Sequence, residues 1–236
     1  MLILAIETAT PQVGVALASF DGAVASFHAS RDRRHAESLV PAIDFVCRQA
    51  GVVPADLGAV AVDVGPGLFT GLRVGLSTAK TMAHALRIPM VGISSLDLLA
   101  FSARLTERHI VAGVDARRGE IFVATYRRVH GGVQRLTEPT VTTPDVVGGV
   151  VEAFGEDCLF VGDGMSRYAD TFCRLRGVEM ATESLRYPSA AALAELAHSK
   201  AVREEFVQPR DIEPIYLREP DATPNWKSAA RGGPNP

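Results

Sequence analysis

The stretch VDVGPGLFTG, residues 62–71, decides the fold, because an apolar strand there runs into a glycine-rich turn and then into a helix. Turns of this kind often cradle phosphate, and two nucleotide motifs place fixed demands on them. A P-loop needs lysine after its second glycine, whereas Leu72 and Arg73 follow Gly71. The dinucleotide fingerprint needs glycine at position 70, where Thr70 stands. Both motifs fail, and a looser anion site at the start of the helix stays open as an alternative.

The turn itself, Gly65, Pro66 and Gly67, is expected to lead the strand tightly into a helix that has Thr70 as its N-cap and runs to about Arg87. One stripe of this helix is apolar and is expected to dock on a sheet: Leu72, Leu76, Ala79, Ala83 and Leu86. The adjacent stripe carries Gly71, Gly75, Thr78 and Met82. Each glycine inside a helix costs about 1 kcal/mol relative to alanine. The pair therefore predicts a shallow groove for a helix of the same chain or of a partner subunit.

Elements on either side of this unit complete one lobe. Apolar and alternating patterns predict strands over 2–7, 13–18, 23–29, 57–64 and 90–93, and helices over about 37–50, 71–87 and 95–104. The first of these helices is expected to begin near Glu37 or Ser38, because Pro41 fits only a first turn or a kink. Gly51 is expected to end it. The order β-β-β-α-β-α-β-α is typical of a ribonuclease-H-like lobe.

The pattern then restarts further along the chain. Strands are predicted over 110–115, 121–128 and 158–162, and helices over 144–154, 168–176 and 190–200. The sequence thus indicates an α/β protein with two tandem ribonuclease-H-like lobes. Residues 1–105 are expected to form the first lobe and residues 106–220 the second. The last helix of the second lobe can pack against the first lobe in this interpretation. Residues 221–236 lose all periodicity and collect Pro, Gly and Asn, which indicates a flexible tail.

Composition narrows the class of protein. The chain of 236 residues is 47% hydrophobic and 22% charged, typical of a packed soluble protein. A net charge of −3 argues against a protein that coats nucleic acid, although a local basic patch stays compatible with it. The three cysteines lie far apart, so neither a zinc ribbon nor a disulfide framework is indicated. The N-terminus has no signal-peptide pattern and no membrane span is found, so we expect a cytoplasmic protein without membrane contact.

Catalytic patterns are missing from the sequence. His35 and Glu37 do not form the zinc-protease pattern, and we interpret them as surface residues at a helix start. Ser94 and Ser95 lie outside any nucleophile elbow. Carboxylates at strand ends, where active-site acids could stand, are Glu7, Asp115, Glu120 and Asp163. Residues 8–11 after Glu7 hold no glycine, so their side chains would crowd a phosphate. Glu7, Thr8 and Asp163 are kept as weak nucleotide or anion contacts.

Six segments stand out along the chain: ILAIETAT, HAESLVPAI, GPGLFTGLRVGLSTAKTMA, VDARRGEIFVATYR, LFVGDG and PIYLREPDA. Taken together, these segments resemble the TsaB (YeaZ) family, subunits of the bacterial machinery that makes threonylcarbamoyladenosine at position 37 of tRNA. The resemblance covers nearly all of residues 1–220. The family implies an actin-like ATPase (ASKHA) fold and kinship with TsaD, the catalytic subunit. Where TsaD-like proteins carry two metal-binding histidines, this chain has Ser95 and Leu99, so the resemblance implies no metal, no cofactor and no catalytic residue.

The resemblance further implies a scaffold that pairs with TsaD in a heterodimer, joins TsaE in a ternary complex, forms a homodimer alone, and meets tRNA indirectly through the complex. The interface lies on the two first-lobe helices, and its expected residues are His35, Ser38, Leu39, Val40, Ile43, Gly71, Arg73, Val74, Gly75, Thr78 and Met82. Two alternatives stay open, an ATPase or kinase of the same fold and a metallopeptidase of the M22 type.

Overall fold

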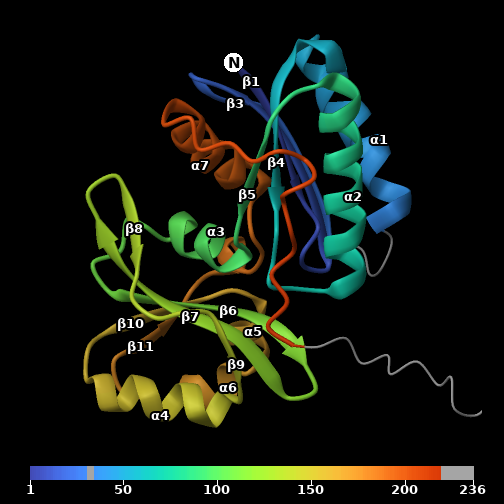
Figure 1. Cartoon of the computed structure of the whole chain (residues 1–236). Helices are drawn as coiled ribbons and strands as arrows, with labels where there is room; N and C mark the ends of the chain where they lie inside the picture. The colour runs from blue at the N-terminus through green and yellow to red at the C-terminus, as the bar shows by residue number, and fades with distance from the viewer. Residues whose placement is uncertain (31–34, 219–236) are drawn as a thin grey trace, which may run out of the picture.

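The chain folds into two lobes, each built on one mixed sheet with helices against both of its faces (Figure 1). The computed structural model describes residues 1–30 and 35–218. The first lobe contains β1 (Leu2–Glu7), β2 (Gln12–Ser19), β3 (Gly22–Ser30), α1 (His35–Ala50), a 3₁₀ turn (Pro54–Asp56), β4 (Leu57–Asp63), α2 (Phe69–Leu86), β5 (Met90–Ile93) and α3 (Ser95–Ser102). The second contains β6 (His109–Arg117), β7 (Glu120–Val129), β8 (Gly132–Arg135), β9 (Thr140–Thr142), α4 (Pro144–Phe154), β10 (Cys158–Val161), α5 (Asp163–Arg167), α6 (Ala169–Phe172), β11 (Val178–Met180) and a 3₁₀ turn (Glu183–Leu185). The last helix, α7 (Ala190–Val202), returns to the first lobe.

The two sheets repeat one topology. The first has the order β3-β2-β1-β4-β5 and the second, read from its other edge, β8-β7-β6-β10-β11, with β9 beside β7. In both sheets the first three strands are antiparallel and the later ones join in parallel. The expected repeat of a ribonuclease-H-like lobe is confirmed. Because β1 and β4 run parallel, Glu7 and Asp63 end neighbouring strands at the same edge of the first sheet.

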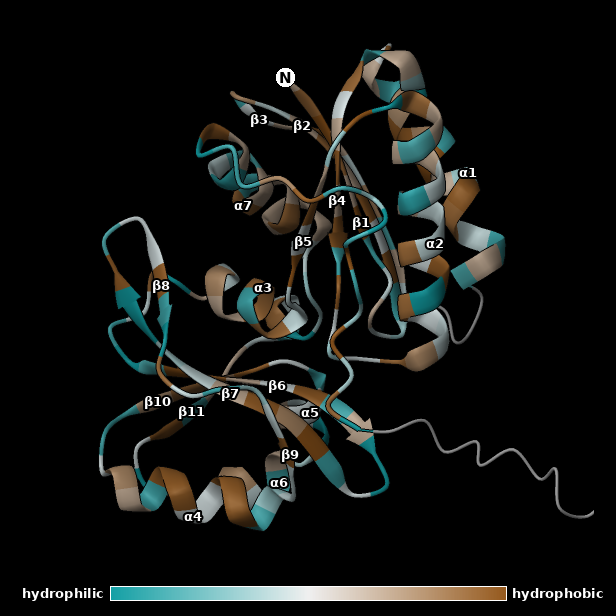
Figure 2. Cartoon of the chain, in the orientation of Figure 1, coloured by the Kyte–Doolittle hydropathy of each residue, from teal (hydrophilic) through white to brown (hydrophobic). Residues whose placement is uncertain are grey.

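The core follows from the two-residue period of the strands. Along β1, Leu4 and Ile6 face α1 and α2, while Ile3 and Ala5 face α7. Figure 2 shows the apolar residues gathered on these strands and on the helix faces turned towards them. Helix α3 lies between the lobes: Leu98 packs with the first sheet, whereas Leu96 and Leu99 pack with the second. The lobes are therefore joined by a shared apolar layer.

The helices differ from expectation at three places. Helix α1 begins at His35, whose buried side chain holds the first turn by a hydrogen bond to the carbonyl of Thr10, and Pro41 lies inside the helix. Thr70 is not an N-cap: α2 begins at Phe69, and the backbone N–H of Leu68 is held by Ala9 O at 2.7 Å. The expected helix over 168–176 shrinks to α6, preceded by the unforeseen α5.

Short edge strands β8, β9 and β11 were also missed, since three or four residues give too little alternation to register as a pattern. The expected tail, 221–236, lies outside the described residues. The lobe boundary at 105/106 stays a prediction. No helix in the described part of the chain is long and apolar enough to cross a membrane.

Candidate functional site

The glycine turn, residues 65–67, is packed against other segments of the same chain, which occupy the space where a phosphate would bind. Gly65 has φ +95°, and its N–H donates to Asp63 Oδ1 at 2.7 Å. A Cβ on Gly67 would overlap the carbonyl oxygen of Ala9, in the turn between β1 and β2. The carbonyl of Gly65 in turn accepts from the N–H of Ser95 at 2.9 Å. The turn thus joins α2, α3 and the β1–β2 turn by main-chain contacts.

The glycine pair of α2 serves the same close packing and does not form an open groove, which corrects one expectation. Gly71 and Gly75 are buried, and a Cβ on either would overlap Thr8: its carbonyl oxygen at Gly71, its Oγ1 at Gly75. The Thr8 hydroxyl donates to Gly71 O at 2.8 Å. The glycines therefore let α2 approach the β1–β2 turn of the same chain, and they offer no surface to a partner.

His35 is likewise internal, contrary to the surface position that the sequence suggested. It is 4% exposed, and its Nε2 lies 2.7 Å from Thr10 O, so that nitrogen carries the proton and donates. Leu39 and Ile43, two further expected interface residues, are buried with the first sheet. The sequence could have indicated this, since residues 35, 39 and 43 follow the four-residue spacing of a buried stripe.

Two carboxyl groups are buried together at the edge of the first sheet. Asp63 Oδ1 accepts from Ser95 Oγ and from the N–H of Gly65, each at 2.7 Å. Burial raises the pKa of Asp63 to about 7 against the lowering effect of these two donors. Burial, and then the charge of Asp63, raise the pKa of Glu7 well above its ordinary value. Glu7 Oε1 accepts from the N–H of Ala9 at 2.9 Å.

The positions aligned with metal-binding histidines hold no ligand set. Ser95 is fully buried and its hydroxyl donates a hydrogen bond to Asp63, whereas Leu99 lies in the apolar layer between the lobes. Within residues 1–30 and 35–218 no group of three His, Cys, Asp or Glu side chains is placed to hold a metal ion. The Asp63–Ser95 contact was missed from the sequence, where an acid just before a Gly-Pro turn was its one signal.

Asp163 occupies the equivalent edge of the second sheet. Its Oδ1 accepts from the N–H of Asp115 at 3.1 Å, and burial raises its pKa to about 6. Asp115 is also buried and forms ion pairs with Arg117 and Arg167. Glu7 and Thr8 have their hydrogen bonds in the first lobe and Asp163 has its own in the second. The structure records no contact that would join the three into one anion site among the described residues.

A long groove lies on the outer surface between α1 and α2. One part of about 690 Å³ is lined by Val40, Ile43, Cys47, Val53, Thr81 and Met82, among others. The adjoining part, about 550 Å³, is lined by Val40, Phe69, Arg73, Val74, Ser77 and Thr78, among others. Val40 stands between the two and is 61% exposed. Of the expected interface residues, the exposed or half-buried ones are Ser38, Val40, Arg73, Val74, Thr78 and Met82.

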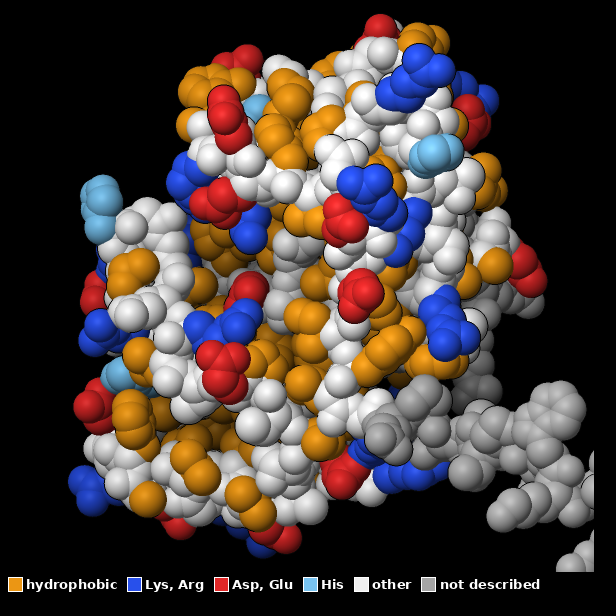
Figure 3. Space-filling view, viewed as in Figure 1, with side chains coloured by type: hydrophobic (Ala, Val, Ile, Leu, Met, Phe, Trp, Pro, Cys, Tyr) orange, Lys and Arg blue, Asp and Glu red, His pale blue; other side chains and the backbone are white. Residues whose placement is uncertain are grey.

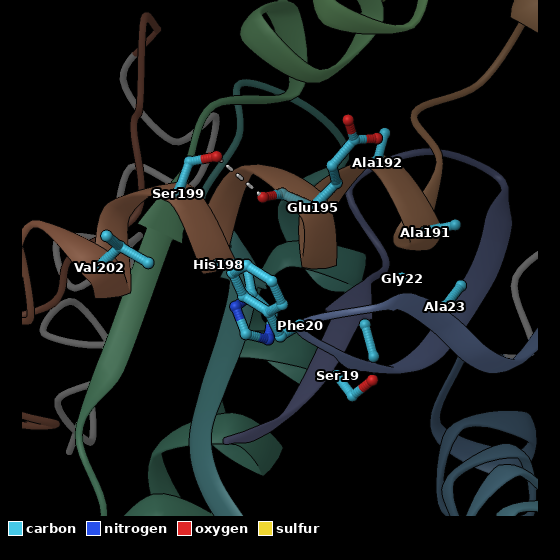
Figure 4. Close-up of a pocket in the computed structure, with 11 residues that line it drawn as sticks. Ser19, Phe20, Gly22, Ala23, Ala191, Ala192, Glu195, His198, Ser199 and Val202 are labelled. Carbon is cyan, nitrogen blue, oxygen red and sulfur yellow. Dashed lines mark hydrogen bonds between the residues drawn. The ribbon is translucent and has the colours of Figure 1, made fainter.

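Two other hollows differ in chemistry. A cleft of about 550 Å³ between the lobes is lined by aromatic and arginine side chains. A smaller one of about 360 Å³ lies between the β2–β3 hairpin and α7 (Figure 4). Its polar groups already have partners in the chain, since His198 Nε2 lies 3.1 Å from Met1 O and Glu195 pairs with Arg104. The hollow by α7 therefore lacks converging polar groups free to orient a ligand.

Comparisons with known proteins identify the family of this chain. The family model described as tRNA N6-adenosine threonylcarbamoyltransferase (TsaD) matches residues 23–226. The tRNA threonylcarbamoyladenosine biosynthesis protein TsaB of Escherichia coli (strain K12) is 30% identical over 96% of this chain and 97% of its own.

Solved structures agree as well. A Pseudomonas aeruginosa protein described as similar to peptidase YEAZ superposes with a TM-score of 0.79 at 28% identity, covering 92% of this chain and 99% of its own. The activator of 2-hydroxyisocaproyl-CoA dehydratase from Clostridium difficile, with a TM-score of 0.52 at 12% identity over 92% of this chain and all of its own, shares the fold alone. The fold is the expected actin-like ATPase (ASKHA) fold. The chain therefore belongs to the TsaB (YeaZ) family of tRNA threonylcarbamoyladenosine biosynthesis proteins, within the wider family of the transferase model.

Proposed function

We propose that this protein is a non-catalytic subunit that binds the TsaD transferase through the groove between α1 and α2, and that this binding is required for threonylcarbamoyladenosine formation at position 37 of tRNA. In this proposal TsaE joins the pair in a ternary complex, and two copies of the chain use the same surface when TsaD is absent. No cofactor of its own is required.

The observation that carries the proposal is the apolar character of this surface. Val40 on α1, Val53 beyond its end and Phe69 at the start of α2 are 38–61% exposed and line this groove. Between them the groove is lined by Met82, Thr78 and the floor residue Ile43. A contiguous exposed apolar surface on a packed protein marks a protein–protein contact more often than a solvated face. Of the six expected interface residues that are exposed or half-buried, all except Ser38 line this groove.

Two observations speak against an ATPase or kinase. In the first lobe, the turn that would face a phosphate is packed against α2, with Ala9 O accepting from Leu68 N–H and Thr8 lying on both glycines. In the second lobe, Asp163 already accepts from the main chain of Asp115. A metallopeptidase is disfavoured because Ser95 and Leu99 stand at the aligned ligand positions and are both buried.

The test is a calorimetric titration of the full chain with the TsaD protein of the same organism. Val40→Asp replaces an apolar side chain at the middle of the groove by a charge, which a bound partner would remove from water. Its matched control is Val146→Asp on α4, because Val146 is also an exposed helical valine, at 53% against 61%, and lies on the other lobe. We expect at least a hundredfold weaker binding for Val40→Asp, equivalent to about 3 kcal/mol, and wild-type binding for the control.

A reconstituted modification assay on tRNA accompanies the titration. Formation of the modified nucleoside should require the wild-type chain and fall with Val40→Asp in parallel with binding. Wild-type affinity in the Val40→Asp variant would refute the interface. Modification by TsaD without this chain would refute the accessory role itself. Magnesium-dependent ATP hydrolysis by the chain alone would refute the non-catalytic assignment.

A further inference from the structure

The cleft between the lobes gathers residues from three separate segments. Phe69 and Arg73 come from the N-terminal end of α2, referred to as its foot. Arg117 and Arg118 come from the β6–β7 turn, and Tyr216 and Arg218 from the last described segment. The cleft is about 550 Å³ in volume and is distinct from the α1–α2 groove, although Phe69 and Arg73 border both. Figure 3 shows basic side chains near the foot of α2 and near the β6–β7 turn, on either side of the junction of the lobes.

Charge in the cleft opposes that of the whole chain. Its lining includes four arginines and one carboxylate, Asp115, whereas the chain carries a net charge of −3. Asp115 forms ion pairs with both Arg117 at 3.1 Å and Arg167 at 3.5 Å, and Arg218 forms an ion pair with Glu120 beside the cleft. Arg73 stacks on the Phe69 ring at 3.7 Å and donates to the Tyr216 hydroxyl at 3.4 Å, with no carboxylate partner recorded among the described residues. The cleft is therefore an electropositive patch on an acidic protein.

The β6–β7 turn holds its two arginines in an unfavourable backbone conformation. Arg117 has φ +63° and Arg118 φ +55°, next to Gly119 at φ +82°. A register shift between Asp115 and Arg117 marks a bulge that re-aims the side chains at the end of the hairpin. Asparagine or glycine would fill such left-handed positions at lower free energy than arginine. Side chains kept at this kind of position against the local preference are typical of ligand clamps.

Two aromatic rings complete the site. Phe69 and Tyr216 are 38% and 42% exposed, with ring centroids 5.4 Å apart and planes inclined by 37°. Exposed aromatic rings next to arginines are the combination that binds unpaired nucleotides, because the rings stack on bases and the guanidinium groups pair with phosphates. A regular duplex keeps its bases stacked inside and could use the arginines alone.

We propose that the cleft between the lobes binds single-stranded RNA directly, with Arg117 and Arg118 on its phosphates and an unstacked base on the Tyr216 ring. The inference rests on the proposed function, since it gives a tRNA-modification subunit its own contact with RNA where the sequence implied only an indirect one. An open cleft with arginines on both lobes suits a strand passing through, which a free mononucleotide would not need.

The experiment measures fluorescence anisotropy of a fluorescein-labelled single-stranded RNA with the full-length chain over a series of salt concentrations. Arg117→Ala/Arg118→Ala should weaken binding about tenfold and lower the slope of log Kd against log salt by about 1.4, the release of two phosphate contacts. The matched control is Arg127→Ala/Arg128→Ala, an exposed arginine pair on the same hairpin with the same loss of charge. Tyr216→Leu should weaken binding about tenfold without changing the slope, because stacking releases no counter-ion.

Equal weakening by the two arginine pairs, equal binding of duplex RNA, or displacement of the RNA by ADP would each overturn the assignment. So would the absence of binding to single-stranded RNA at low salt. Circular dichroism melting of each variant checks that the fold is retained. The TsaD titration separates this inference from the proposed function: Arg117→Ala/Arg118→Ala should bind TsaD as wild type, and Val40→Asp should bind RNA as wild type. Loss of only one activity then identifies which proposal fails.

Discussion

Replacing Gly75 by alanine tests whether the glycines of α2 exist for contact within the chain. A Cβ at this position would lie well under 3.0 Å from Thr8 Oγ1, whereas Thr8 Cβ would be 3.4 Å away, an ordinary contact. Overpacking of this kind costs up to about 3 kcal/mol, offset by about 1 kcal/mol of better helix propensity. We therefore expect Gly75→Ala to lower the free energy of unfolding by about 2 kcal/mol.

A second substitution makes the prediction specific. Thr8→Ala removes Oγ1 and with it the hydrogen bond to Gly71 O, which costs about 1 kcal/mol. In the double variant Thr8→Ala/Gly75→Ala the overlap is gone, so the two changes should couple favourably by about 2–3 kcal/mol. Gly71→Ala is the matched control, because its Cβ would overlap the main-chain oxygen of Thr8, which Thr8→Ala leaves in place.

Urea unfolding of the wild type, the three single variants and the two double variants gives both coupling energies. A Gly75→Ala variant as stable as wild type would refute the packing argument. So would equal coupling of Thr8→Ala with both glycine substitutions, since the two overlaps involve different atoms of Thr8. If instead Gly75→Ala left stability unchanged and weakened TsaD binding, the result would support the partner groove that the sequence predicted at these glycines.

Two further predictions concern buried polar groups. Burial raises the pKa of Asp63 from 3.8 to about 7 in the folded protein. The protonated carboxyl therefore stabilises the fold fully below pH 3.8, and this stabilisation is lost as pH rises through the folded-state pKa. Asp63→Asn keeps an oxygen that accepts from Ser95 and Gly65 but cannot ionise. The free energy of unfolding of this variant should fall less between roughly pH 4 and pH 8, by up to about 4 kcal/mol. An unchanged pH profile would contradict the raised pKa. Tyr126 donates to Asp97 Oδ1 at 2.9 Å beside the bidentate Arg135, so Tyr126→Phe should lower stability by about 1 kcal/mol, and a larger loss in thermal unfolding would mean that Arg135 depends on it.

Local patterns in the sequence were sufficient for most of the first lobe. Strand β1, with its alternation of residues towards two apolar layers, was predicted with its bounds, and so was helix α4. The apolar stripe of α2 was also predicted, since a period near four residues directly reports a buried helix face. The repeat of one strand order in both lobes followed from the same periodicities, and the family followed from motifs that lie almost entirely on these elements.

The tertiary structure decided what the glycines, His35 and the arginines do. Gly71 and Gly75 read as an open stripe because helical periodicity says which residues share a face but not which segment lies against it, and that segment is the β1–β2 turn, more than sixty positions away at Thr8. His35 is buried for the same reason, through Thr10. The basic cleft was invisible because Arg73, Arg117 and Arg218 are far apart in the chain. Periodicity is a local property of the chain, whereas contact between distant segments depends on how the two sheets and their turns come together.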